Sequence, residues 1–165
     1  MPGIKGIDNT NVSTAEDILY GRKNTGFGPV VVCGGGEVGG ETAEFVSNVS
    51  QDVTILEMQP GILNDMSILS KILLMGCLQQ RGVKIITGAK VTEITENSVC
   101  YEDAGGNTVS VPAETVISAF GYKAYNPLEE TARKICDEVY VIGCAVKAGN
   151  AVTAMREGYE ARTKL

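Results

Sequence analysis

The hydrophobic residues of the chain gather in short apolar runs that are separated by polar or glycine-rich segments. Runs that are continuously apolar and rich in β-branched residues are typical of strands buried on both faces of a parallel sheet. We predict strands of one parallel sheet at Val30–Cys33, 53–56, Lys84–Thr87, Thr115–Ser118 and 139–142.

Other apolar residues recur at the three- to four-residue spacing of a helix, as Ala43, Val46 and Val49 do. A short helix is also predicted near the N-terminus, because Ser13 or Thr14 can cap it and an acidic residue follows three positions later. The longer helices are predicted over residues 41–49, 68–78 and 151–165.

The spacing changes again after residue 90, where short apolar runs alternate with turn-forming residues. Three antiparallel strands are therefore predicted at 91–94, 99–101 and 109–111. The complete order predicts an α/β, Rossmann-like FAD/NAD(P)-binding domain. Its parallel sheet would have a three-stranded antiparallel β-meander as one crossover.

A glycine-rich loop follows the first predicted strand. Gly34, Gly36 and Gly39 form the pattern G-x-G-x-x-G between a strand and a helix. In that setting the first glycine allows a tight turn, the second lets the backbone approach a pyrophosphate, and the third lets the helix lie close to the strand. The loop is completed by the residues between them, Gly35, Glu37 and Val38.

An acidic residue, Glu57, closes the second predicted strand and lies 23 residues after Gly34. A carboxylate there can accept hydrogen bonds from both ribose hydroxyls of an adenosine and repels a 2′-phosphate. The next residue, Met58, and its neighbours supply no arginine to offset that repulsion. The pattern favours NADH over NADPH.

Four other interpretations stay open from the residues alone. The glycine loop can be a structural turn, and Glu57 can be a solvated acid at a strand end. Glu37 and Glu41 can simply complement the dipole of the helix that follows the loop. An S-adenosylmethionine methyltransferase also ends its second strand with an acid, although it would have a looser glycine pattern and no meander.

Composition narrows the classes of function. The 165 residues, 44% of them hydrophobic, are enough for an ordinary domain with a core. The net charge is −6 and lysine and arginine do not cluster, which argues against a nucleic-acid partner. No apolar run approaches the roughly 18 residues of a membrane span, and we expect no membrane association and no secretory signal.

Five cysteines are scattered without a CxxC pair, and histidine is absent. Scattered thiols are typical of small core residues in a reducing compartment, so we expect a cytoplasmic protein. The absence of histidine excludes Ser-His-Asp hydrolysis, Cys-His proteolysis and histidine-ligated metal sites. We identify no catalytic constellation and no metal site.

Six segments together resemble one family. They are TAEDILYG, VVVCGGGEVGGETAEF, VTILEM, GVKIITGAKVTEI, ETVISAFGY and EVYVIGCAVKAGNAVTAMREGYEA. They are similar to the C-terminal part of the NADH:flavin oxidoreductases related to 2-enoate reductase, 2,4-dienoyl-CoA reductase and trimethylamine dehydrogenase. The resemblance covers nearly the whole chain. It implies a linker with a short helix at 1–28, an NAD(H)-binding domain at 29–122 and the closing flank of an FAD-type domain, strand plus helix, at 123–165.

The resemblance also assigns roles to individual residues. It implies that the three motif glycines meet the pyrophosphate and that Glu57 meets the adenosine ribose. Glu41 matches an acid that approaches the nicotinamide, and Val38 matches a residue beside the nicotinamide ring. Gly121 matches a turn over the dinucleotide.

The chain departs from the family pattern on the FAD side. Where the family has Gly-Asp, with the aspartate on FAD, this chain has Gly143 and Cys144, and a further turn has Ala124 in place of proline. A thiol is a weak hydrogen-bond donor and does not replace a carboxylate. The first FAD motif of the family has no counterpart here. We expect this chain alone to hold FAD poorly, and to be a fragment or expressed domain of a longer enzyme.

The resemblance implies the NADH-binding domain of a flavin-dependent oxidoreductase, which positions NADH for hydride transfer to a flavin. Its partner would be the missing FAD and barrel portion of the parent enzyme, and a homo-oligomer is left open. The alternative is a non-catalytic NAD(H)-binding or assembly module that has lost flavin binding.

Overall fold

The structure is a computed structural model that describes residues 3–164 and divides into two compact units, Met1–Gly121 and Tyr122–Leu165. The first unit has the predicted α/β fold, which is thereby confirmed. It contains a five-stranded sheet and a separate three-stranded sheet.

The five-stranded sheet is parallel throughout, with the strand order β1-β8-β2-β3-β4. At its centre, Val32 of β2 is in register with Ile55 of β3 and Ile117 of β8, and all three side chains are fully buried. The strands span Val12–Thr14 (β1), Val30–Cys33 (β2), Val53–Glu57 (β3), Lys84–Thr87 (β4) and Thr115–Ser118 (β8).

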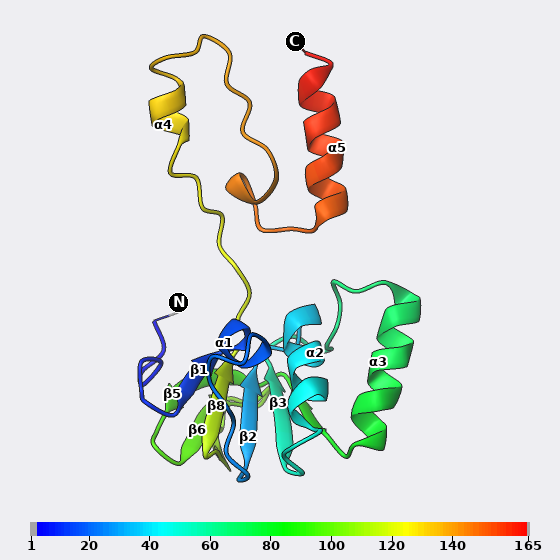
Figure 1. Cartoon of the computed structure of the whole chain (residues 1–165). Helices are drawn as coiled ribbons and strands as arrows, with labels where there is room; N and C mark the ends of the chain where they lie inside the picture. Colours follow the sequence, from blue (N-terminus) through cyan, green and yellow to red (C-terminus); the bar gives the residue numbers. More distant parts are fainter. Residues whose placement is uncertain (1–2, 165) are drawn as a thin grey trace. The chain divides into compact units, whose positions relative to one another are not determined.

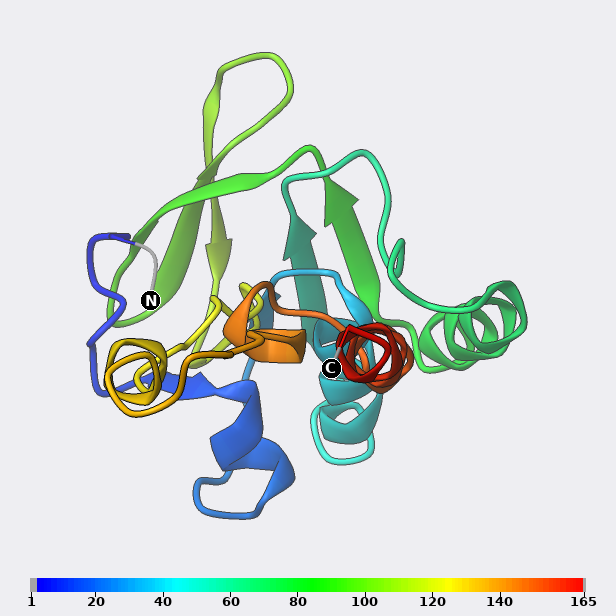
Figure 2. The same ribbon diagram turned by 90° about the horizontal axis from the view of Figure 1, so that it is seen from above.

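Alternate residues of the central strand, β2, pack into two separate hydrophobic cores on opposite faces of the sheet. Val30 and Val32 of β2 belong to a core shared with three helices, α1 (Ala15–Leu19), α2 (Glu37–Val46) and α3 (Ile68–Gln80). Val31 and Cys33 belong to the other core, on the opposite face. There the sheet is covered by the predicted meander, β5 (Lys90–Ile94), β6 (Ser98–Glu102) and β7 (Thr108–Pro112). Figures 1 and 2 show these layers.

Helix α2 begins at Glu37, earlier than the predicted start at residue 41. Gly39 and Gly40 are poor helix formers, so the apolar spacing alone places the start after them. In the structure both glycines are buried against other segments. Tertiary packing therefore extends the helix back into the glycine loop.

The N-terminal segment is more than the predicted linker and short helix. It contributes β1 to the edge of the parallel sheet, and the carbonyl of Lys5 accepts a hydrogen bond from the Ile94 amide at 2.8 Å. Ile7 is buried with the meander residues. Thr14 caps α1 as predicted, accepting from the Asp17 amide at 3.1 Å.

The second unit contains α4 (Glu129–Ala132), the 3-10 helix η1 (Gly143–Ala145) and α5 (Ala151–Arg162). None of its described residues is buried. The strand predicted at 139–142 is wrong, because this segment has no strand pairing among the residues described. A parallel strand requires a neighbouring strand, and the second unit contains none within residues 122–164.

No helix within residues 3–164 is long and apolar enough to cross a bilayer.

Leu78 is the one fully buried side chain of α3, whereas Leu73 on the same helix is 72% exposed. We expect Leu78→Ala to lower the free energy of unfolding by about 2–5 kcal/mol, because it leaves a cavity under the helix. Leu73→Ala should change it by less than about 0.5 kcal/mol. Urea unfolding followed by circular dichroism measures both. Equal effects of the two substitutions would contradict the packing of α3 described here.

Candidate functional site

The candidate site lies at the carboxyl edge of the parallel sheet. From β2 the chain runs outward through β3 and β4, and it then returns across the meander to β8 on the other side of β2. The strand order therefore reverses between β2 and β8. In open parallel sheets, ligands bind outside the carboxyl ends of the strands at such a reversal.

The glycine loop is pressed against the end of β8. Gly34 has a φ of +113°, and a Cβ built on it would stand 2.2 Å from the carbonyl oxygen of Ala119. A Cβ on Gly39 would stand 2.0 Å from the carbonyl oxygen of Gly34. Real side chains cannot make such contacts, so glycine is required at both positions. Three pieces of backbone thus meet with no side chain between them.

A further segment closes over the glycine loop from the other side. Residues 58–67, which we call the strap, connect β3 to α3. The amide of Leu63 donates to the carbonyl of Gly35 at 2.7 Å. Cβ atoms on Gly35 and Gly40 would collide with Ile62 and Leu63, at 2.5 and 2.4 Å. The strap and the glycine loop therefore form one packed unit.

Leu63 also carries backbone strain, since its φ is +57° and its side chain is fully buried. The left-handed conformation costs a residue with a Cβ about 1–2 kcal/mol. The hydrogen bond to Gly35 and the burial of the side chain offset this cost. The strap is a part of the site that was not predicted, although its sequence shows an apolar Ile-Leu pair within a polar loop.

Glu57 is half-buried at the end of β3, and its carboxylate is fixed by two backbone amides. Its Oε2 accepts from the Gly35 amide at 2.6 Å, and its Oε1 accepts from the Gln59 amide at 2.7 Å. Neither oxygen accepts a further hydrogen bond from the described residues, and each can still accept one. The carboxylate predicted to bind the adenosine ribose is thus held in one orientation beside the glycine loop. The next residue, Met58, is exposed.

The start of α2 is capped by a residue from the strap. Gly36 is the N-cap and has no side chain to offer, and the amide of Glu37 donates to Asp65 Oδ1 at 2.9 Å and Oδ2 at 3.2 Å. A Cβ on Gly36 would lie 3.2 Å from the same Oδ2. Asp65 was not predicted as a site residue. It lies 28 residues after Glu37, and no local sequence pattern indicates a contact between the two.

Four other predicted residues lie in the first turns of α2 or at the end of the first unit. Glu37 and Glu41 project from α2, and partial burial, followed by the charge of Glu37, raises the pKa of Glu41. Val38 is half-buried against the helix-side core. Gly121 has a φ of +84° and is exposed.

Gly143 and Cys144 belong to the second unit, in η1. Gly143 has a φ of +61°, and its amide donates to Glu157 Oε2 at 2.6 Å. Cys144 is exposed, and its Sγ lies 3.7 Å from the Gly149 carbonyl oxygen. These two residues therefore form a local turn against α5.

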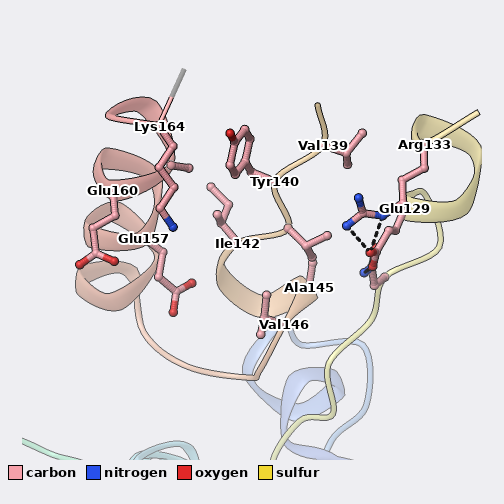
Figure 3. Close-up of a pocket in the computed structure, with 13 residues that line it drawn as sticks. Glu129, Arg133, Val139, Tyr140, Ile142, Ala145, Val146, Glu157, Glu160 and Lys164 are labelled. Atoms are coloured by element: carbon pink, nitrogen blue, oxygen red, sulfur yellow. Dashed lines mark hydrogen bonds and ion pairs between the residues drawn. The ribbon is translucent and has the colours of Figure 1, made fainter. Parts of the chain in front are cut away.

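An open pocket of about 550 Å³ lies within the second unit, and none of the predicted site residues lines it. Figure 3 shows Tyr140 and Ile142 between α5 and the Glu129–Arg133 ion pair, whose N···O distance is 2.9 Å. The apolar part of the lining is the unpaired segment 139–142 with its neighbours. We interpret the pocket as space beside the irregular segment 139–142 rather than as a ligand site.

Comparison with known proteins identifies the family. A family model described as pyridine nucleotide-disulphide oxidoreductase matches residues 1–158. The chain belongs to this family. Proteins of the family bind FAD and NAD(H), so the predicted cofactors are confirmed at the level of the family.

Similar proteins are long oxidoreductases. The bilirubin reductase of Mediterraneibacter gnavus (strain CC55_001C) is 33% identical over 100% of this chain and 26% of its own length. The NADH oxidase of Thermoanaerobacter brockii is 34% identical over 96% of this chain and 25% of its own length. A solved 2-naphthoyl-CoA reductase in complex with 2-naphthoyl-CoA has a TM-score of 0.85 and 32% identity, over 100% of this chain and 25% of that one. The chain thus spans about a quarter of each.

Gly39 and Gly76 offer a matched test of the glycine packing in this pyridine nucleotide-disulphide oxidoreductase chain. Both lie in helices, but a Cβ on Gly76 would meet nothing within 4 Å. We expect Gly39→Ala to lower the free energy of unfolding by about 1–3 kcal/mol or more, because α2 must move away from the loop. Gly76→Ala should raise it by about 0.5–1 kcal/mol. Denaturant unfolding compares the two, and a neutral Gly39→Ala would refute the close approach.

Proposed function

We propose that the chain is the NADH-binding part of a flavin-dependent oxidoreductase. The observation that carries this proposal is the joint placement of the glycine loop and Glu57 where the strand order reverses. The family match supports a pyridine nucleotide as the ligand. The similarity to a 2-naphthoyl-CoA reductase supports the finer proposal of an enzyme related to 2-enoate reductase.

The residues present fit a dinucleotide. Glycine at position 36 keeps a Cβ out of the space at the start of α2, where it would stand 3.2 Å from Asp65 Oδ2. The amides of Val38 and Gly39, in the first turn of α2, have no side-chain acceptor among the described residues and can donate to phosphate oxygens. The positive end of the helix dipole adds to that attraction.

Glu57 would select NADH over NADPH. Its two oxygens are already oriented by the Gly35 and Gln59 amides, so no ordering of its side chain is needed when ribose hydroxyls approach. A 2′-phosphate would meet a fixed carboxylate instead. The adjacent strap residues supply no arginine to neutralise it.

When bound, NADH would supply the hydride that a flavin accepts, so the protein's task is alignment rather than acid or base chemistry. In this proposal the glycine loop holds the pyrophosphate and Val38 lies beside the nicotinamide ring. Glu41, whose pKa is raised by partial burial and by the charge of Glu37, would approach the nicotinamide. Gly121 would form the turn over the dinucleotide.

The chain would work as part of a larger enzyme. It spans about a quarter of its relatives, and apolar side chains of α3 are exposed, namely Ile68, Leu69, Ile72 and Leu73. The apolar segment 139–142 of the second unit pairs with no strand among the residues that the structure describes. We propose that residues 123–165 are the closing flank of an FAD-type domain, and that the rest of the enzyme supplies the other strands of that domain. The five free cysteines support a reducing compartment such as the cytoplasm.

A non-catalytic NAD(H)-binding module is the second candidate. The exposed thiol of Cys144, at a position where the family has a carboxylate for FAD, favours it.

Nucleotide preference tests the first proposal. We expect NADH to bind about tenfold or more tightly than NADPH, and Glu57→Gln to narrow the difference because it removes the charge that repels a 2′-phosphate. Glu102→Gln, at the end of β6, removes the same charge away from the loop and should leave the preference unchanged. Isothermal titration calorimetry measures all three proteins. Tighter binding of NADPH by the unmodified chain would refute the assignment.

The visible spectrum of the chain co-expressed with the rest of a relative, compared with that of the chain alone, separates the two candidates. Because Cys144 stands where the family has a carboxylate and residues 122–164 form no buried core, we expect a colourless protein that still binds NADH when expressed alone. Co-expression with the remaining three-quarters of a relative should give flavin absorbance if the chain is part of an oxidoreductase. Absence of flavin from that reconstituted pair would favour the non-catalytic module.

A further inference from the structure

We propose that Asp65 sets the affinity of the glycine loop for phosphate-bearing ligands, because its carboxylate takes the place at the start of α2 that a pyrophosphate must occupy. The inference rests on the proposed NADH site. It adds a residue from the strap that competes with the ligand instead of binding it.

The Asp65 carboxylate lies at the start of α2, beside Gly36 and the Glu37 amide. Both of its oxygens accept from the amide of Glu37, at 2.9 and 3.2 Å. One of them also lies 3.2 Å from the point where a Cβ on Gly36 would stand. The space that the second motif glycine leaves open is therefore filled by a carboxylate of the same chain.

A carboxylate and a phosphate cannot share this position. The Glu37 amide has one hydrogen, and both Asp65 oxygens already use it. Two anions at hydrogen-bond distance from one amide also repel each other. A pyrophosphate can reach the start of α2 only after the Asp65 side chain has turned away, and the lost cap weakens the observed binding.

The strap backbone holds Asp65 close to the Glu37 amide even when the Asp65 side chain rotates away. The Leu63 amide is bonded to the Gly35 carbonyl, and both Ile62 and Leu63 are buried beside the loop glycines. The Asp65 side chain itself is exposed, and no lysine or arginine of the described chain pairs with it. Rotation of one exposed side chain is thus enough to open the position, while the strap backbone stays in place.

The competition has a chemical signature. Any ligand that brings phosphate to α2, such as NADH or ADP-ribose, must displace Asp65. Adenosine has no phosphate, so it can meet Glu57 while Asp65 stays on the Glu37 amide. Asp65 therefore lowers the affinity for the first class of ligand and leaves the second class unaffected.

The test is Asp65→Asn, whose side-chain oxygen can still accept from the Glu37 amide without the negative charge. We expect NADH and ADP-ribose to bind about three- to tenfold more tightly to this variant, and adenosine to bind as before. Calorimetry measures NADH and ADP-ribose, and an NMR titration of the full chain measures adenosine. Asp65→Ser, a second neutral acceptor, provides the same comparison if the asparagine variant does not fold.

Asp103→Asn is the matched control. Asp103 also accepts backbone amides, from Gly105 at 2.8 Å and Asn107 at 2.9 Å, but it does so in the β6–β7 turn. It removes the same charge, so a gain in NADH affinity equal to that of Asp65→Asn would show a net-charge effect and overturn the proposal.

Other results also overturn it. Unchanged or weaker NADH binding by both Asp65 variants would mean that Asp65 is a structural cap or a ligand contact. Tighter adenosine binding would mean a general loosening of the site. A different result would refute the proposed NADH site itself: neither the unmodified chain nor any variant binds NADH, ADP-ribose or adenosine.

Discussion

The structure of the site depends on one steric constraint, the contact of three stretches of backbone at Gly34, Gly39 and Ala119. No side chain separates them, and a Cβ at either glycine would overlap a carbonyl oxygen. This contact fixes the start of α2 against the ends of β2 and β8. The orientation of the amides that face a ligand follows from it, because a helix that stood further from the sheet would point them elsewhere.

A second layer of contacts depends on the first. Glu57 and the strap both use the backbone of Gly35, one through its amide and the other through its carbonyl. The acid at the end of β3, the loop and the segment leading to α3 are therefore tied to one residue. The strain of Leu63 is tolerated within this arrangement because its side chain is fully buried.

The sequence predicted the elements whose signals are local. The apolar strands of the first unit, the meander with its turns and the cap at Thr14 follow from spacing and residue type. The strap and Asp65 could not be predicted, since their contacts join segments far apart in the chain. The segment 139–142 shows the opposite error, because an apolar run indicates the capacity to form a strand and says nothing of whether a neighbour is present.

The position of β8 has a consequence for how the first unit folds. β8 is the last strand of the unit to be synthesised, yet it inserts between β1 and β2, where Val30 pairs with Thr115. Pairings between such distant residues form slowly, because a long loop must close first. Before that insertion Gly34 has no Ala119 to lie against. The glycine-loop site is therefore among the last features of the domain to be completed, although its motif is synthesised before β8.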